Sequence, residues 1–450
     1  MGMETKINIA KPELNKLASF RQSIYRCFTR AADALFELLD ALLCSPSLPS
    51  FPELSCSSVF RRRWPSLYEA LQDGKLDREQ LLKHCVENLP VTPRPLLIGD
   101  HTAWGRPQAR TLKDRPFEHQ PTPIRGQKPI TIGHGYSTLG VVPESAGSWF
   151  LPLLHERIPS DTTPSAQAAE QLRRVCPLLD RRPVALYDSE YGSGTFLNHT
   201  QNISSDLLLR IRPNRQLRRA PGPYSGHGRP PLHGTVFRLG DPTTWGRPNA
   251  SWEGEDSALG PVRVECGYAL HFEDAPTRPL DWFRVQRRQA QGTRRDPGIV
   301  WLGWCSPTRL AIATGWRDYL RRYVIEHWYR FANQSLHWKQ PQLSTPEQSQ
   351  LWATMIPLAT WPLYLAHQRV QDQPRPWQKQ QPQLTPGRVH QAMGGILAGI
   401  GTPAAAPKPR GKSPGWPTGR IRTKRTRYPV IKKTVAKTKK QVPNTMNASP

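Results

Sequence analysis

Hydrophobic residues recur at helical spacing near the N-terminus and form strand-like runs further along the chain. Between residues 12 and 43 the apolar positions follow a period close to 3.6, which predicts a helix, and Ser45-Pro46 ends it. The stretches "WPSLYEAL" (64–71) and "DREQLLKHCVENL" (77–89) predict two more helices. Residues 1–90 are therefore predicted to form a small helical domain.

Short apolar runs then alternate with turn residues, which is typical of strands. The order is three strands, a helix, a strand, a short helical stretch and another strand, which predicts a mixed α/β layer over 91–212. The predicted strands are 95–100, 130–142, 148–158, 183–188 and 205–212, and the predicted helix is 165–179.

Three further segments differ in composition from this layer. Residues 213–303 are rich in Gly and Pro, with short alternating runs, and are predicted to be a β-rich insertion. Helices resume near Thr314, within 304–400. Residues 401–450 contain many Lys and Arg, and no acid follows Thr402, so they are predicted to be a flexible basic tail.

Composition indicates the class of partner. Lys and Arg outnumber Asp and Glu by 62 to 35, which gives a net charge of +27 and predicts a polyanionic partner, DNA or RNA. The seven cysteines have no C-x-x-C spacing, so neither a zinc site nor a disulfide framework is indicated. The N-terminus lacks a signal peptide, and the most apolar segment, 34–43, is too short to span a bilayer, so we expect a cytoplasmic protein without membrane contact.

Two predicted strands end in aspartate. Asp100 follows "LLIG" and Asp188 follows "VALY", where a buried strand emerges from its sheet. A strand fixes a carboxylate at such a point, and the following loop admits substrate and cation. Taken alone, an aspartate after a strand is more often a turn former or a helix cap than a catalytic acid.

A third acid, Glu326, lies on a predicted helix in "RDYLRRYVIEHWYRFANQSLHW" (317–338). At 100° per residue, Tyr319 and Arg322 fall on the same face as Glu326, while the apolar stripe begins at Leu320 on the opposite side. The alternative is an exposed helix on which Arg322 and Glu326 form an ion pair worth a few tenths of a kcal/mol.

The combination of two strand-end aspartates and a later glutamate resembles the DDE transposases, whose catalytic core has an RNase H-like fold. More narrowly, the helix resembles the Tyr-x-x-Arg-x-x-x-Glu-x-x-x-x-x-x-Lys signature of bacterial insertion-sequence transposases. Tyr319, Arg322 and Glu326 match this signature, whereas Asn333 stands where Lys is expected. The resemblance covers residues 97–368, and the phrases "DHTAWGRPQARTLKDR" and "YDSEYGSG" also carry it.

This resemblance implies a domain order. We expect a helical N-terminal domain (1–90) that binds DNA ends, followed by an RNase H-like mixed sheet with flanking helices. The core would occupy 91–212 and 304–400, with the β-rich insertion (213–303) between its two parts and a disordered basic tail (401–450) after it.

The resemblance also implies a cofactor and site residues. Two Mg²⁺ ions, for which Mn²⁺ can substitute, would be held by Asp100, Asp188 and Glu326. Such cations activate the attacking oxygen and stabilise the leaving oxygen of an in-line displacement. The residues expected to contact DNA phosphates are Tyr319, Arg322, Arg330, Asn333 and Lys339, of which Arg330 or Lys339 would replace the missing signature Lys.

An internal echo offers a second candidate for the first aspartate. "GDHTAWGRP" (99–107) recurs as "GDPTTWGRP" (240–248), so Asp241 is a rival to Asp100. Chain order favours Asp100, because the core needs its first acid before Asp188 and Asp241 lies in the insertion.

The function implied is cut-and-paste transposition: the enzyme would bind the inverted repeats of a mobile element, cut both ends and join them to target DNA. Pairing two ends implies a dimer on double-stranded DNA, associated with a prokaryotic nucleoid. The alternatives are a catalytically impaired DNA-binding relative, suggested by Asn333, and a metal-dependent structure-selective nuclease, which would not explain Tyr319 and Arg322.

Overall fold

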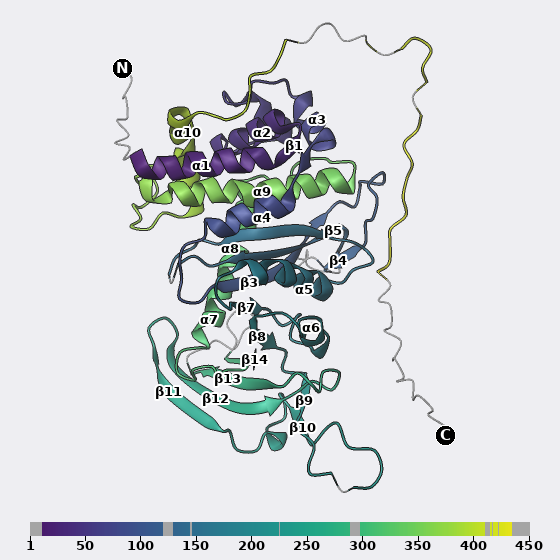
Figure 1. The fold of residues 1–450 in the computed structure, drawn as a ribbon, viewed down its shortest axis with the longest axis vertical. Helices are drawn as coiled ribbons and strands as arrows, with labels where there is room; N and C mark the ends of the chain where they lie inside the picture. The colour runs from purple at the N-terminus through teal and green to yellow at the C-terminus, as the bar shows by residue number, and fades with distance from the viewer. Residues whose placement is uncertain are drawn as a thin grey trace, which may run out of the picture.

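The computed structural model describes most of the chain and part of its basic tail. The described residues are 11–119, 129–144, 146–224, 226–288, 298–409, 415, 417–421 and 423–433. From one end of the molecule to the other, it consists of a layer of helices, a sheet with its own short helices, and a lobe made of strands (Figure 1). The remainder of the predicted tail lies outside the described residues.

A five-stranded mixed core forms the centre of the largest sheet. Its strands are β3 (Leu96–Gly105), β5 (Ile130–Val141), β6 (Leu151–Ile158), β7 (Val184–Tyr187) and β8 (Asp206–Ile211). Their spatial order is β6-β5-β3-β7-β8; β5 is antiparallel to both β3 and β6, while β7 and β8 run parallel to β3. Helix α5 (Pro164–Val175) links β6 to β7, and α6 (Gly194–His199) links β7 to β8. The predicted RNase H-like mixed sheet is confirmed.

Strands from the β-rich segment extend this sheet, which has ten strands in all. β14 (Ile299–Cys305) pairs antiparallel with β8, and β13, β12 and β11 continue outward from it. A short strand, β4 (Phe117–His119), pairs with β5 on the other side. The bounds of the outer strands are Ala250–Asp256 for β11, Gly260–Leu270 for β12 and Leu280–Arg287 for β13; β9 (Gln216–Arg218) and β10 (Val236–Arg238) form a separate pair.

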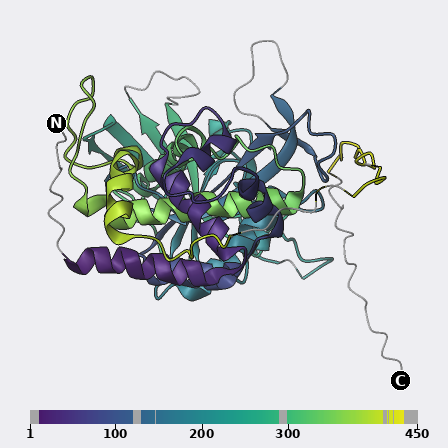
Figure 2. The ribbon, with the colours of Figure 1, turned by 90° about the horizontal axis from the view of Figure 1, so that it is seen from above.

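N-terminal and C-terminal helices together build the helical layer. The long helix α9 packs against α1, α2, α3 and α10 on one side and against β6 on the other (Figures 1 and 2). Its bounds are Pro346–Ala366, and those of the others are α1 (Lys11–Cys27), α2 (Ala32–Cys44), α3 (Pro65–Asp73), α4 (Arg78–Glu87) and α10 (Pro386–Ile400). Segments more than 300 residues apart in the sequence therefore share one hydrophobic core.

The helix predicted over 12–43 is two helices. Residues Phe28–Arg30 form a short strand, β1, which pairs with β2 (Lys75–Leu76), and Ala31 takes a left-handed conformation with φ of 54°. The apolar period continues through this break because both helices bury one side in the same layer, so the pattern alone hid it.

The helix predicted to carry Glu326 is also interrupted. It consists of α7 (Arg317–Leu320), a 3₁₀ turn (Arg321–Tyr323) and α8 (Val324–Gln334). A 3₁₀ turn has three residues per turn, so it changes which side chains face inward. The expectation for the start of the helix was therefore wrong: Leu320 is 43 % exposed, and Tyr319 is 9 % exposed.

Candidate active site

Asp100 and Asp188 lie beside each other on neighbouring parallel strands. Ile98 of β3 pairs with Leu186 of β7. Asp100 comes two residues after Ile98, and Asp188 comes two residues after Leu186. Because parallel strands advance together, this register places the two carboxylates at the same level of the sheet. Asp188 directly follows the end of β7, whereas β3 continues past Asp100 to Gly105.

A close approach between the strands fixes this register. A Cβ atom added to Gly99 would lie 2.0 Å from the ring of Tyr187, the residue just before Asp188. Tyr187 is itself fully buried. Only glycine fits beside this ring, so the Gly99-Asp100 pair is a structural requirement of the site as well as a turn-like string.

Arg322 connects Glu326 to Asp100. Arg322 lies in the 3₁₀ turn, and Glu326 lies in the first turn of α8, which packs near β3. The Arg322 guanidinium donates to the Glu326 carboxylate at 2.8 Å and lies 3.5 Å from the Asp100 carboxylate. The helix ion pair considered as the alternative is thus present, but its arginine also contacts a second acid.

The carboxylates around Asp100 place several negative charges where little solvent reaches them. Burial raises the pKa of Asp100 to about 6, and the neighbouring Asp188 carboxylate adds to this rise. Arg322 and His101 act in the opposite direction without cancelling it. The surrounding acids in turn raise the pKa of the Arg322 guanidinium, so it stays charged. One arginine does not compensate the clustered carboxylates.

Three hydroxyl groups close to the acids were not anticipated. Thr138 lies opposite Asp100 on β5; it accepts a hydrogen bond from the Tyr329 hydroxyl at 2.9 Å and is bonded to His155 at 2.8 Å. The Tyr191 hydroxyl bonds the ring of His101 at 3.1 Å. Burial, aided by the charge of Asp100, raises the pKa of both tyrosines. Tyr329 could have been found, because it lies one helical turn after Glu326; Thr138 has no local signal.

The other residues expected to contact DNA differ from one another in their surroundings. Arg330 is exposed on α8 and lines a cavity of about 300 Å³ beside the start of α10. The side-chain oxygen of Asn333 is buried and has no hydrogen-bond partner among the described residues. Lys339 lies 5.1 Å from the centre of the Trp338 ring, and burial lowers its pKa to about 8. Tyr319 has its ring centre 6.0 Å from the Arg322 guanidinium.

Asp241, the rival first aspartate, has a different local role. It caps the 3₁₀ helix Pro242–Thr244 and accepts hydrogen bonds from the backbone and hydroxyl of Thr243 at 3.1 and 2.6 Å. It follows β10, which belongs to the two-stranded sheet and not to the ten-stranded one. The two copies of "GD-x-T" therefore differ in structure: the first lies inside β3, and the second is a helix cap.

The carboxylate oxygens of the site are donors of the kind that a divalent cation needs. Two adjacent carboxylates with an unfavourable charge balance suit a hard cation such as Mg²⁺, which takes few protein ligands and completes its octahedron with water. Within the described part of the chain, no group of three His, Cys, Asp or Glu side chains is close enough to hold one ion. The Arg322 guanidinium contacts both Asp100 and Glu326, so the positive charge beside these two acids comes from the protein itself.

An RNase H-like sheet with two acids on adjacent strands and a glutamate on a later helix is the arrangement expected of a carboxylate-dependent nuclease. The family described as "DDE superfamily endonuclease" matches residues 23–269, more than half of the chain. The chain belongs to this family, and membership implies a DNA-cleaving enzyme. No curated protein matches the sequence. The match ends before Glu326 and does not cover the helix that carries it.

Proposed function

We propose that this protein is a DDE transposase that cuts DNA at the ends of a mobile element and joins them to target DNA. The observation that carries the proposal is the level register of Asp100 and Asp188 on adjacent strands, with Glu326 linked to Asp100 through Arg322. A nuclease needs the aspartates alone. The Tyr319, Arg322 and Glu326 set resembles the transposase signature and favours the narrower function.

Asp100 and Asp188 would hold a divalent cation, and Glu326 would complete the site. The full site would hold two Mg²⁺ ions, for which Mn²⁺ could substitute. A cation held there would supply activation of a water or a 3′-hydroxyl and stabilisation of the leaving oxygen. The chain's own contribution is position: β3 and β7 fix the two aspartates, and the Tyr187 ring against Gly99 holds these strands in register.

Arg322 is proposed to exchange partners when DNA binds. Its planar guanidinium can grip a phosphate with two parallel hydrogen bonds, as it now grips carboxylates. A phosphate that drew the guanidinium away would release Glu326 toward the aspartates. Tyr319, buried beside it, would orient the arginine and contact the backbone near the cut.

The remaining assignments are proposals of the same kind. The helices of residues 1–90 would bind the inverted repeats, with 91–212 and 304–400 as the catalytic core, 213–303 as an insertion and 401–450 as a basic tail. Arg330, Asn333 and Lys339 would line the DNA path after Glu326. Pairing of two ends would need a dimer on DNA, working on a prokaryotic nucleoid. No helix among the described residues is long and apolar enough to cross a membrane.

A second candidate is a transposase-derived protein that binds DNA ends but cuts poorly. Asn333 favours it, because the position lacks the positive charge of the signature and its buried oxygen is unpartnered within the described chain. An Asn333→Lys variant would discriminate: restored charge should increase cutting in an impaired protein and change it little in a competent one.

The test uses a supercoiled plasmid that carries both ends, taken from the DNA flanking the gene, with Mg²⁺ or Mn²⁺. We expect wild-type protein to release the element and join it to a second plasmid, and Asp100→Ala, Asp188→Ala and Glu326→Ala to bind the ends without either product. Asp241→Ala is the matched control and should retain both. Cutting without any joining would mean that the protein is a nuclease and not a transposase. Loss of cutting in Asp241→Ala alone would mean that Asp241, and not Asp100, is the first catalytic acid.

A further inference from the structure

Part of the basic tail is docked on the body of the protein. The docked tail segment, Tyr428–Lys433, lies along the anchor segment, Arg110–His119, which follows β3 and includes β4. The Tyr428 backbone N–H donates to the Arg110 carbonyl at 2.9 Å, and that of Ile431 donates to the Arg115 carbonyl at 3.1 Å. Ile431 pairs in parallel with Pro116, so the tail adds to the rim of the sheet beside β4.

Side chains reinforce this backbone pairing. Arg115, 2 % exposed, donates to the Tyr428 carbonyl at 3.3 Å and uses its other nitrogens on the carbonyls of Leu112 and, just before the anchor segment, Arg106 and Pro107. The Lys433 ammonium lies 2.7 Å from the buried carboxylate of Glu118. The Lys113 ammonium lies 5.3 Å from the centre of the Tyr428 ring. A solvated polycationic tail would have no need of such specific contacts.

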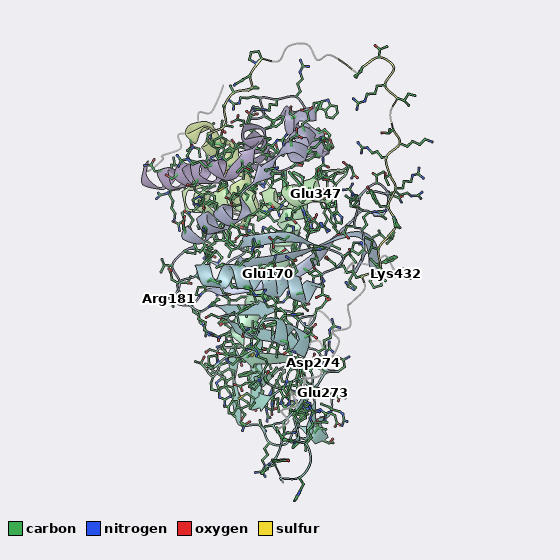
Figure 3. The ribbon with its side chains drawn as sticks, turned by 45° about the vertical axis from the view of Figure 1, so that its right-hand side comes forward. Glu170, Arg181, Glu273, Asp274, Glu347 and Lys432 are labelled. Carbon is green, nitrogen blue, oxygen red and sulfur yellow. The ribbon has the colours of Figure 1, made fainter. Side chains whose placement is uncertain are left out.

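Docking leaves a surface with one sign of charge. The two acids of the anchor segment are both neutralised, Asp114 by Arg157 and Glu118 by Lys433. The Lys and Arg side chains that remain exposed along the two segments and just before the tail segment have no exposed acid among them. We call these the basic track: Arg110, Lys113, Lys424, Arg425, Arg427 and Lys432. Figure 3 places Lys432 at the side of the sheet layer, away from the helical layer.

The anchor segment follows, along the chain, the strand that carries Asp100. Asp100 and Gly105 belong to β3, and the anchor segment begins five residues after this strand ends. At about 3.3 Å per residue, the end of β3 is roughly 17 Å from Asp100, about the length of five base pairs of duplex DNA. A duplex engaged at the acids and running along β3 would meet the track.

We propose that the docked tail and the anchor segment together form a binding surface for the phosphate backbone of double-stranded DNA next to the cut site. This inference rests on the proposed function, because it takes the partner to be the DNA held at the acids. The tail would thus act as a fixed part of the DNA-binding surface, and its charges would count only while it is docked. Nearness to the acids is what favours DNA over an anionic membrane as the partner.

The first experiment tests docking in the full-length protein without DNA. Pro116→Cys with Ile431→Cys places two thiols on paired residues, which a disulfide can bridge. We expect oxidation to close it, seen as loss of two free thiols and a mobility change reversed by reductant. Pro116→Cys with Thr426→Cys is the matched control and should not close. Equal closure of both pairs, or of neither, would overturn the docked arrangement.

The second experiment measures binding to a duplex by fluorescence anisotropy over a range of salt concentrations. Lys424→Gln, Arg425→Gln and Arg427→Gln together should weaken binding about 10- to 100-fold near 0.1 M salt and reduce the salt slope by about 2 to 3. The control removes the same charge from the β9–β10 region with Arg229→Gln, Arg238→Gln and Arg247→Gln. It should change binding less than about threefold.

The oxidised Pro116→Cys, Ile431→Cys protein should bind the duplex as tightly as the wild type, because its tail is locked in the active position. Weaker binding after closure, or an equal loss in both charge variants, would overturn the proposal. Binding of the track charges to anionic lipid vesicles but not to the duplex would assign the surface to a membrane instead. If wild-type protein binds no duplex at all, it is the proposed function that fails, and the disulfide result still stands on its own.

Discussion

At the scale of single residues, Asp100 is held in a state that costs the free protein stability. Its pKa is raised from an ordinary value of 3.8 to about 6, chiefly by burial. The folded protein therefore holds this proton more tightly than the unfolded chain does. Stability falls as the pH rises through the window from about 4 to 6, and the full cost remains above it. Sites built to bind a cation are commonly destabilised in this way.

We therefore predict that Asp100→Asn stabilises the metal-free protein by about 1–3 kcal/mol above pH 6 and by little at pH 4. The gain comes from removing a buried charge, and it is limited because Arg322 loses a partner. The measurement is the melting temperature in EDTA at pH 4, 5, 6 and 8 beside wild type. A gain that is the same at every pH, or a loss above pH 6, would contradict the electrostatic account.

Arg322 is the counter-ion of the site, so its removal should have the opposite sign. Arg322→Ala leaves the clustered carboxylates without compensation and should destabilise the metal-free protein by about 2–4 kcal/mol. A divalent cation would then take over part of its role. We expect Mn²⁺ to raise the melting temperature more in Arg322→Ala than in wild type. Equal shifts in the two proteins would mean that Arg322 and the cation do not occupy the same place.

The candidate acids could be predicted from the sequence because each has a local signature. Asp100 and Asp188 follow apolar runs, and Glu326 sits at fixed spacing from Tyr319 and Arg322. The contact between Arg322 and Asp100 could not be predicted, since it joins residues more than 200 positions apart. The same holds for the hydrogen bond of Thr138 with Tyr329, which depends on the β3–β5 register.

At the scale of elements, most strands of the core could be predicted, because buried strands between turn residues are locally distinct. The break at Phe28–Arg30 and the 3₁₀ turn at Arg321–Tyr323 could not. The first depends on pairing with β2, and the second fits the chain against β3. Both are set by tertiary contacts that no local period contains.

The β3–β7 register gives a prediction at this scale. Gly99→Ala would place a methyl group against the Tyr187 ring, so the strands must shift; we expect a loss of at least about 3 kcal/mol and weaker DNA cutting. Gly387→Ala in α10 is the matched control, because nothing lies within 4 Å of its added Cβ. Tyr187→Leu in the Gly99→Ala background should recover part of the stability. Equal melting temperatures for the two alanine variants would refute the close approach.

At the scale of the whole molecule, helices from early and late parts of the chain share one helical layer. α9 packs on α1 and on β6, and Arg21 of α1 forms a buried ion pair with Asp40 while also bonding the carbonyl of Gly401 at 3.0 Å. The sequence separated residues 1–90 from 304–400 because composition changes between them. Which distant helices cover each other is not visible in local periodicity.

This shared layer predicts that residues 1–90 do not fold by themselves. Without α9, α1 to α3 keep their contacts with one another but lose the helix that covers all three, and small helical fragments need such packing for stability. A purified 1–90 fragment should show weak helicity by circular dichroism and no cooperative thermal transition. A sharp transition in that fragment would mean that the N-terminal helices are an independent domain.

The central claim is that the carboxylates of Asp100 and Asp188 together support metal-dependent cutting of DNA. The most direct measurement is single-turnover cleavage of an end-bearing duplex with Mg²⁺ or Mn²⁺, with DNA binding measured on the same samples. We predict that the wild type cuts the duplex. The cleavage rate should fall at least about 1,000-fold in Asp100→Asn and in Asp188→Asn, while DNA binding is retained. Cutting that persists in either variant, or that proceeds in wild type with EDTA, would contradict it.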